Sequence, residues 1–243
     1  LDAIPLLIGS HKMSYSFTSI LFLIAVAFTM YAQSTVNSNF RRYSNVRNQR
    51  GITGAQAARA VLDANGLGDV QIEQIRGSLT DHYDPRKRVL RLSQTVYGVA
   101  SVAAVSVACH EAGHAIQHAQ NYGPLTFRNN IVPIVNIASR FSWVLIIIGI
   151  GMAASGSYMG DMLFNLGVLF FLAVIVFHAV TLPVEFNASN RALDQMELIG
   201  VIYEEEEHGA RKVLRAAAMT YVASLAVAIV NLLRILAMRG NRD

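Results

Sequence analysis

Two histidines four positions apart, with a glutamate directly after the first, are the residues of this chain best suited to chemistry. His110, Glu111 and His114 form an HExxH pentapeptide within residues 99–120, a run without proline. Residues four apart share one face of a helix, so both imidazoles can point at one Zn²⁺ while Glu111 borders a water bound there. The pattern favours a metal-dependent hydrolase. A buried histidine pair that is only hydrogen-bonded in a core is the alternative.

Neither of the nearby polar side chains completes such a site. His118 continues the same helix face, but it lies roughly 6 Å further along the axis than His114, too far to share a tetrahedral ion. We expect His118 beside the ligands or at the surface. The metzincin pattern requires a histidine six residues after His114, and that position is Gln120.

A catalytic zinc therefore needs a third protein ligand from elsewhere in the chain. The downstream candidates are Asp161, His178, Glu185, Asp194, Glu197, Glu204 to Glu207 and His208. Glu185 stands out because it follows an apolar segment, where Pro183 is expected to break or restart a helix and leave a carboxylate near the membrane edge. An ion pair of Glu185 with Arg191 or Arg140 is the alternative interpretation.

Three stretches of the chain carry a resemblance to a known family. They are LTDHYDPR at 79–86, VACHEAGHAIQ at 107–117 and TLPVEFNAS at 181–189. Together they resemble the bacterial membrane family of neutral zinc metallopeptidases, the YugP-like proteins, from about Tyr31 to Leu236. The chain is more distantly similar to the HtpX-type and CaaX-prenyl-type membrane proteases, in which a glutamate opening an E-x-x-x-D helix is the third zinc ligand. The resemblance implies that role for Glu185.

The chain departs from these patterns near the proposed ligands. Ser189 stands where the motif of the distant relatives ends in an acidic residue, and Asn187 stands where the closer family usually has Asp. We therefore expect weaker or different hydrogen bonds around the ligands. Cys109, unusual directly before the motif, is expected to pack as a lone buried thiol.

The composition indicates a protein embedded in a bilayer. Of 243 residues, 53% are hydrophobic and 15% are charged, against about 25% charged in soluble domains. The formal net charge is +4, but the basic residues are scattered among apolar ones without aromatic interleaving. They fit the flanks of membrane helices better than a nucleic-acid surface. A single cysteine excludes an internal disulfide.

Four apolar segments approach the roughly 20 residues that a bilayer requires. They are 15–32, 131–154 with Arg140 inside it, 162–182 and 216–233. The first could be a secretory signal, because Ala25-Val26-Ala27 resembles a cleavage site, but its length favours an anchor. The glycine- and serine-rich residues 155–160 predict the turn of a hairpin between the second and third segments.

The region between the first two segments predicts a small mixed domain. Thr53 is a plausible N-cap of a helix that stops at Gly66. Val70 to Ile75 alternates as a strand, and residues 77–92 predict a hairpin around the turn Asp84 to Lys87, directly before the metal helix. This order of strand and HExxH helix is the zincin arrangement. An ordinary hairpin is the alternative.

The predicted fold is a mainly α integral membrane protein with about four transmembrane helices and a small zincin-like α+β domain. The expected divisions are a tail or remnant in 1–14, an anchor in 15–32, the zincin-like region with its HExxH helix in 33–130, a transmembrane hairpin in 131–182, the third-ligand helix and acidic loop in 183–212, and a C-terminal transmembrane helix with its tail in 213–243.

We expect a zinc-dependent peptidase in which Zn²⁺ is held by His110, His114 and Glu185 and Glu111 is the general base. Side chains expected to bind substrate or stabilise the oxyanion are Asp81, His82, Tyr83 and Arg191, with substrate extended beside Thr80 to Tyr83. The alternatives are a metal-binding membrane protein such as a sensor or transporter, and a pseudoprotease scaffold. Few ionisable groups in the apolar segments argue against transport, and the retained Glu111 argues against a pseudoprotease.

The expected partners are a polypeptide substrate, membrane-associated or misfolded, and the lipid bilayer, with no nucleic acid. The expected location is the bacterial cell membrane, crossed several times. Fifteen of the twenty Lys and Arg residues lie in 34–130 and 183–215. Because cytoplasmic loops carry the excess of basic residues, the active site is expected to face the cytoplasm.

Overall fold

The computed structural model describes residues 14–240, so nearly all of the expected tail at 1–14 lies outside the described residues. The chain divides into two compact units. The helical unit contains the residues up to Thr29, Ile134–Val176 and the residues from Ser224 on. The mixed unit contains Met30–Pro133 and Phe177–Ala223.

Four long helices confirm the predicted membrane segments. They are α1 (Tyr15–Ser44), α5 (Gly123–Ala153), α6 (Tyr158–Leu198) and α7 (Glu204–Gly240). Each is long and apolar enough to cross a membrane, yet only 17% to 22% of its most apolar window is buried in the protein. Apolar side chains so exposed would be unfavourable in water, which is the physical signature of a lipid-facing surface.

The helices extend beyond the predicted segments, and one predicted break is wrong. Pro183 was expected to break or restart a helix, but α6 continues through it. Proline removes a backbone hydrogen bond to the residue four positions earlier, and long apolar helices tolerate this loss when neighbouring groups satisfy the freed backbone. Close by, the Thr181 hydroxyl donates to the Phe177 carbonyl over 2.7 Å. Glu185 therefore lies inside a helix and not at a helix start.

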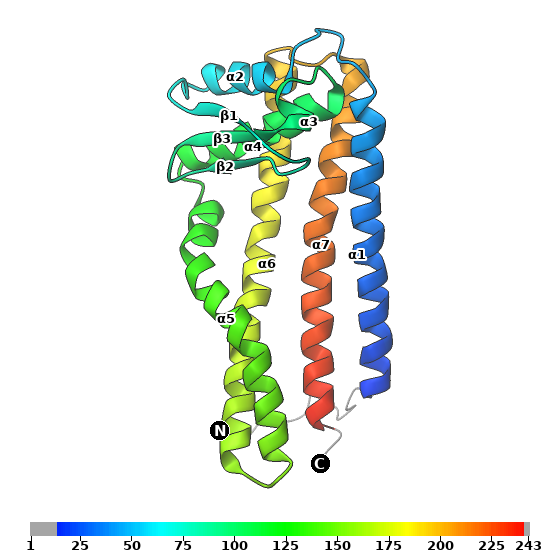
Figure 1. Ribbon diagram of the computed structural model, residues 1–243, viewed down its shortest axis with the longest axis vertical. Helices are drawn as coiled ribbons and strands as arrows, with labels where there is room; N and C mark the ends of the chain where they lie inside the picture. The colour runs from blue at the N-terminus through cyan, green and yellow to red at the C-terminus, as the bar shows by residue number, and fades with distance from the viewer. Residues whose placement is uncertain (1–13, 241–243) are drawn as a thin grey trace, which may run out of the picture. The chain divides into compact units, whose positions relative to one another are not determined.

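In the helical unit, α5 and α6 form a tightly packed hairpin (Figure 1). A Cβ atom at Gly149 would lie 2.4 Å from the Phe164 backbone nitrogen, and one at Gly160 would lie 2.2 Å from that of Ala153. The turn predicted at 155–160 is confirmed, with Gly156 at a φ of 77°. In lipid, no hydrophobic effect drives helices together. Small residues such as glycine let the two backbones touch, and this close contact stabilises the packing.

After the end of α1, the mixed unit contains helix α2 (Gly54–Ala64) and a three-stranded sheet (Figure 1). Thr53 and Gln56 form a capping box at the start of α2, which confirms the predicted cap. The strands β1 (Gln71–Ile75), β2 (His82–Asp84) and β3 (Val89–Ser93) lie in the order β1-β3-β2. The hairpin β2–β3 was predicted, whereas the parallel pairing of β1 with β3 was not.

Two helices follow the sheet, and the second is the core of the mixed unit. The short α3 (Gln94–Tyr97) separates the hairpin from α4 (Val102–Ala119), so the hairpin is not directly before the metal helix. Buried residues of α2, β3, α4, α6 and α7 share one hydrophobic core. This places α4 in the interior, where the surroundings fix its side chains.

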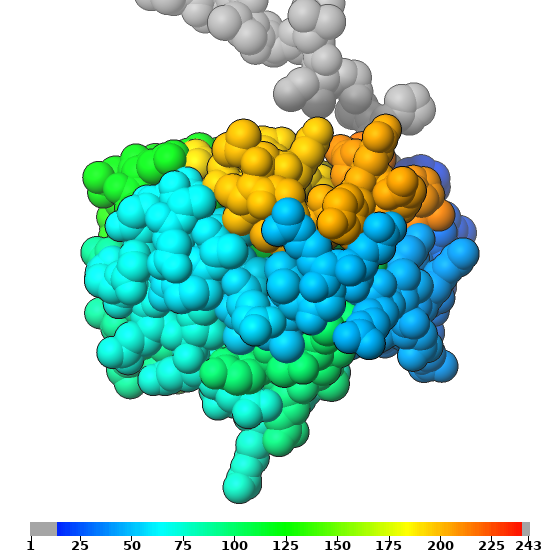
Figure 2. Space-filling view, turned by 90° about the horizontal axis from the view of Figure 1, so that it is seen from above, coloured from blue at the N-terminus to red at the C-terminus, as the bar shows by residue number. Residues whose placement is uncertain are grey.

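The loop after α1 is tied to the start of α7 by a buried carboxylate. Glu206 is 6% exposed and accepts hydrogen bonds from the backbone nitrogens of Gln49, at 2.8 Å, and Tyr203, at 2.9 Å. Figure 2 shows the segment after α1, in blue, beside the gold and orange residues that connect α6 and α7. The acidic run 204–207 was expected to be a loop, and this prediction is wrong, because the run forms the first turn of α7. Carboxylates favour helix N-termini, and Glu206 caps this one.

The hairpin packing predicts different tolerances for two glycines of α5. Gly149→Ala should destabilise the protein by about 1–3 kcal/mol, because its Cβ would meet backbone that cannot move away. Gly151→Ala is the matched control, since a Cβ there meets nothing within 4 Å. Thermal unfolding in detergent micelles measures both variants, and equal midpoints would contradict the packing described for α5 and α6.

Candidate metal centre

Helix α4 presents His110 and His114 on one face, as their spacing predicts. Ser101 caps this helix by accepting a hydrogen bond from the Ala104 backbone nitrogen at 3.2 Å. A Cβ at Gly113 would lie only 2.6 Å from the Ala188 carbonyl oxygen of α6. Glycine is therefore needed for α4 and α6 to approach closely. That approach brings residues of α6 opposite the two histidines.

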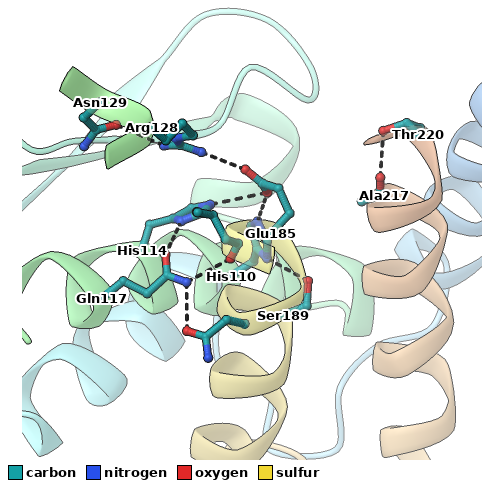
Figure 3. Close-up of polar contacts among 11 residues, drawn as sticks. His110, His114, Gln117, Arg128, Asn129, Glu185, Ser189, Ala217 and Thr220 are labelled. Atoms are coloured by element: carbon teal, nitrogen blue, oxygen red, sulfur yellow. Dashed lines mark hydrogen bonds and ion pairs between the residues drawn. The ribbon is translucent and has the colours of Figure 1, made fainter. Parts of the chain in front are cut away.

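The side chain brought opposite them is Glu185 (Figure 3). Its Oε2 lies 3.3 Å from Nε2 of His110 and 3.5 Å from Nε2 of His114. Ligand atoms of these three residues lie within 4.8 Å of one another, and Glu185 is 4% exposed. Among the residues that the structure describes, this is the group of three or more His, Cys, Asp or Glu side chains with spacing for a metal ion.

Gln117 determines which nitrogen of His114 carries the proton. Its side-chain nitrogen donates to the Val184 carbonyl, at 2.8 Å, and to Asn187 Oδ1, at 2.9 Å. Its Oε1 therefore faces His114 Nδ1, 2.9 Å away, and must accept a proton from it. In a neutral imidazole, Nε2 then holds a lone pair that points at a carboxylate oxygen. Two acceptors that face each other can both bind a cation placed between them, so these residues fit a zinc ion.

Ser189 plays the corresponding part for His110. Its hydroxyl oxygen lies 3.2 Å from His110 Nδ1, which leaves Nε2 to face Glu185. Both histidines are thus oriented by neutral groups, a hydroxyl and an amide, where a carboxylate would raise their basicity further. Asn187 likewise accepts hydrogen bonds through its Oδ1, from Gln117 and from Arg191 Nε at 2.7 Å. Ser189 and Asn187, the two residues that depart from the family pattern, therefore form hydrogen bonds near the ligands but carry no charge.

Arg128, near the start of α5, pairs with the carboxylate oxygen that does not face the histidines. Its Nη1 lies 3.0 Å from Glu185 Oε1. The ion pair expected as an alternative, with Arg191 or Arg140, is thus replaced in the structure by one with Arg128. Like the other basic residues of the chain, Arg128 was expected only to flank a membrane helix. Its position shortly after the metal helix was the one hint that Arg128 could lie near the ligands. The sequence does not show in which direction the chain turns after that helix.

Glu111 lies beside the ligands without joining them. It is 9% exposed, and burial raises the pKa of its carboxyl group to about 7, although the charge of His110 opposes this shift. The backbone N–H of Tyr83 donates a hydrogen bond to it. A carboxyl group with a pKa near neutrality can both accept and release a proton at physiological pH.

A cavity of about 260 Å³ adjoins His110, Glu111 and Glu185. Residues of α1, the hairpin, α4, α6 and α7 line it, among them Asp81 and Tyr221. The Tyr221 hydroxyl is hydrogen-bonded to Glu185. Sequence reasoning missed Tyr221, because it lies in an apolar segment 36 positions after Glu185 and only the packing of α7 brings it here.

The four side chains expected to contact substrate have other partners in the structure. Asp81 accepts hydrogen bonds from the Ser93 nitrogen, at 2.7 Å, and hydroxyl, at 2.9 Å, and it also lines the cavity. His82 is exposed beside Arg91, and Tyr83 bonds His118 Nδ1 at 2.9 Å. Arg191 donates to Asn187 and Gln120. His118 thus lies beside the hairpin, away from the metal group, and the substrate roles stay predictions.

Comparisons with known proteins agree with this donor set. Residues 18–240 match the family described as "Putative neutral zinc metallopeptidase". The chain belongs to this family. It is 47% identical to the "Putative membrane protease YugP" of Bacillus subtilis (strain 168), over 87% of this chain and 92% of that protein. No solved structure matches the chain. The description of the family implies zinc, in agreement with the metal group, and the apolar helices agree with the membrane location in the name of the relative.

The hydrogen bond to His110 predicts a measurable effect on zinc affinity. Ser189→Ala should raise the zinc Kd roughly 10- to 100-fold, because His110 loses the partner that orients its ring. Ser189→Asp should lower the Kd, because a carboxylate makes the imidazole more basic. Competition with a chromogenic chelator measures both. Ser139→Ala is the control, since that hydroxyl bonds only the Asn136 carbonyl of its own helix. Three equal Kd values would contradict the role given to Ser189.

Proposed function

We propose that this protein is an integral-membrane zinc peptidase of the gluzincin type, in which two histidines and a glutamate bind the metal. The observation that carries the proposal is the convergence of two imidazole Nε2 atoms on one buried oxygen of Glu185. The family and the relative support a peptidase and a membrane location. The proposed ligands are His110, His114 and Glu185, which leave a fourth position open toward the cavity for water, as catalytic zinc sites do.

Glu111 is the proposed general base and acid. A bound Zn²⁺ would supply Lewis acidity, lowering the pKa of a water and polarising the scissile carbonyl. Glu111 takes the proton of the attacking water and passes it to the leaving amine, a double role for which a pKa near 7 is suited. The hydrogen bond from the Tyr83 backbone holds its carboxylate at the cavity.

Tyr221 is the side chain best placed to stabilise the developing oxyanion. Its hydroxyl lies beside Glu185 and its side chain lines the cavity. A hydroxyl donor preorganised beside the reacting carbonyl is worth several kcal/mol in such reactions. Asp81, His82, Tyr83 and Arg191 remain proposed as substrate contacts, because β2 is an edge strand along which an extended peptide can align.

The alternative functions are a metal-binding membrane protein without hydrolysis and a pseudoprotease scaffold. Both would need the metal ligands but would have no use for Glu111, whose burial costs free energy and which binds no metal in the proposed site. A buried carboxylate kept beside the ligands and open to a cavity favours the hydrolytic function. The experiment that follows separates these functions.

Substitutions should divide the site into ligands and catalytic groups. We expect Glu111→Gln to retain roughly stoichiometric zinc and lose proteolysis of casein. Glu185→Ala should lose zinc as fully as His114→Ala, whereas His118→Ala should keep it. Tyr221→Phe should keep zinc and lower kcat by about 10- to 1000-fold. Elemental analysis of protein purified in detergent gives the metal content. Full activity of Glu111→Gln, or loss of zinc from His118→Ala alone, would overturn the assignments.

We also propose that the active site faces the cytoplasm of a bacterium, where most basic residues would then lie. Single cysteines at Ser157 and Gln49, each in a Cys109→Ser background, test this orientation. A membrane-impermeant thiol reagent on intact cells should label position 157 and spare position 49. The reverse pattern would place the site outside. Labelling of both positions after lysis is the control for accessibility.

A further inference from the structure

Several aliphatic side chains line one side of the cavity beside the metal group, and this aliphatic wall bears on which peptides the enzyme accepts. The inference rests on the proposed peptidase function. The cavity is continuous with the reaction centre, since His110, Glu111 and Glu185 line the same space. A side chain that neighbours the cleaved bond therefore has this space beside it.

One face of α7 supplies most of that wall. Leu214, Ala217 and Ala218 lie three and four positions apart, so they share a helix face, and all three line the cavity. Figure 3 shows Ala217 and Thr220 on α7, across from the Glu185 carboxylate. Val213, also of α7, and Val107, of α4, complete the aliphatic surface. Leu214 and Ala218 are only 3% and 2% exposed, which makes the wall part of the packed interior.

Two of the three carboxyl groups at the cavity are already committed to partners. Glu185 faces both histidines through one oxygen and Arg128 through the other. Asp81 is held by the nitrogen and hydroxyl of Ser93. A lysine or arginine of a substrate would therefore be desolvated with only Glu111, the proposed general base, as a partner, and an acidic side chain would meet all three carboxyl groups. An aliphatic side chain loses only contact with water, which favours binding.

We propose that this cavity binds an aliphatic side chain of the polypeptide substrate at a residue flanking the cleaved bond, and that Ala217 sets the size of the side chain admitted. The methyl group of Ala217 leaves room that a larger residue would fill. Ala217 is only partly buried in the protein, unlike Ala218, so a larger side chain at 217 can be accommodated by the cavity without displacing the core.

A library of peptides of mixed sequence tests the proposal without a known substrate. The zinc-loaded protein in detergent cleaves the library, and mass spectrometry of the products gives the preference at each flanking position. The wild type should favour Leu, Ile, Val or Met over charged residues at one of them. Ala217→Phe should lower cleavage at Leu at least tenfold relative to cleavage at Ala or Gly, since one methylene is worth about 10- to 200-fold. Leu214→Ala should shift the preference toward Phe.

Two controls keep the outcomes separate. Met219→Phe places the same ring on an exposed part of α7 outside the cavity lining and should keep the wild-type preference. Zinc content and thermal unfolding establish that each variant is folded and loaded. A wild type that cleaves with no aliphatic preference, or an Ala217→Phe profile equal to that of Met219→Phe, would overturn the pocket assignment. No cleavage of any peptide by zinc-loaded wild type would instead overturn the proposed function.

Discussion

The burial of one carboxylate opposite two imidazole lone pairs is the interaction on which the rest of the site depends. A buried charge costs several kcal/mol unless opposite charge and hydrogen bonds compensate it. Arg128 compensates one oxygen of Glu185 from the side, while the other oxygen faces only acceptors in the tautomer that Gln117 imposes. A cation among the three side chains would compensate that oxygen as well. The polar network thus has the donor atoms and the spacing that suit a metal ion.

Close backbone contact makes this burial possible. Gly113 allows α4 to approach the Ala188 carbonyl of α6, and the histidines and Glu185 lie on either side of that contact. A methyl group at position 113 would push α4 away from α6. The two histidines would then lie further from Glu185, at distances that no longer suit a single metal ion. In the helical unit, α5 and α6 also pack closely where glycine lies against backbone, at Gly149 and Gly160. Helix packing and site geometry thus have a common physical origin.

Around the ligands, the hydrogen bonds come from neutral groups. Ser189 and Gln117 orient the two rings, and Asn187 accepts from both Gln117 and Arg191. Neutral partners fix the tautomer and the ring angle while adding no further charge to a region that already holds Glu111 and Glu185. This limits mutual repulsion among buried carboxylates, and it leaves Glu111 with a pKa near 7, raised mainly by its own burial.

The sequence by itself determined the features that depend on local spacing and composition. The i, i+4 histidines on a helix, the capped α2, the β2–β3 hairpin and the apolar spans follow from short-range patterns, and the resemblance to a family gave Glu185 its role. Only the tertiary structure showed the parallel β1–β3 pairing and the continuous helix through Pro183. It also showed that Arg128 and Tyr221 contact Glu185. Each depends on which surfaces meet across long stretches of chain, and packing energies between distant residues leave no mark in local periodicity.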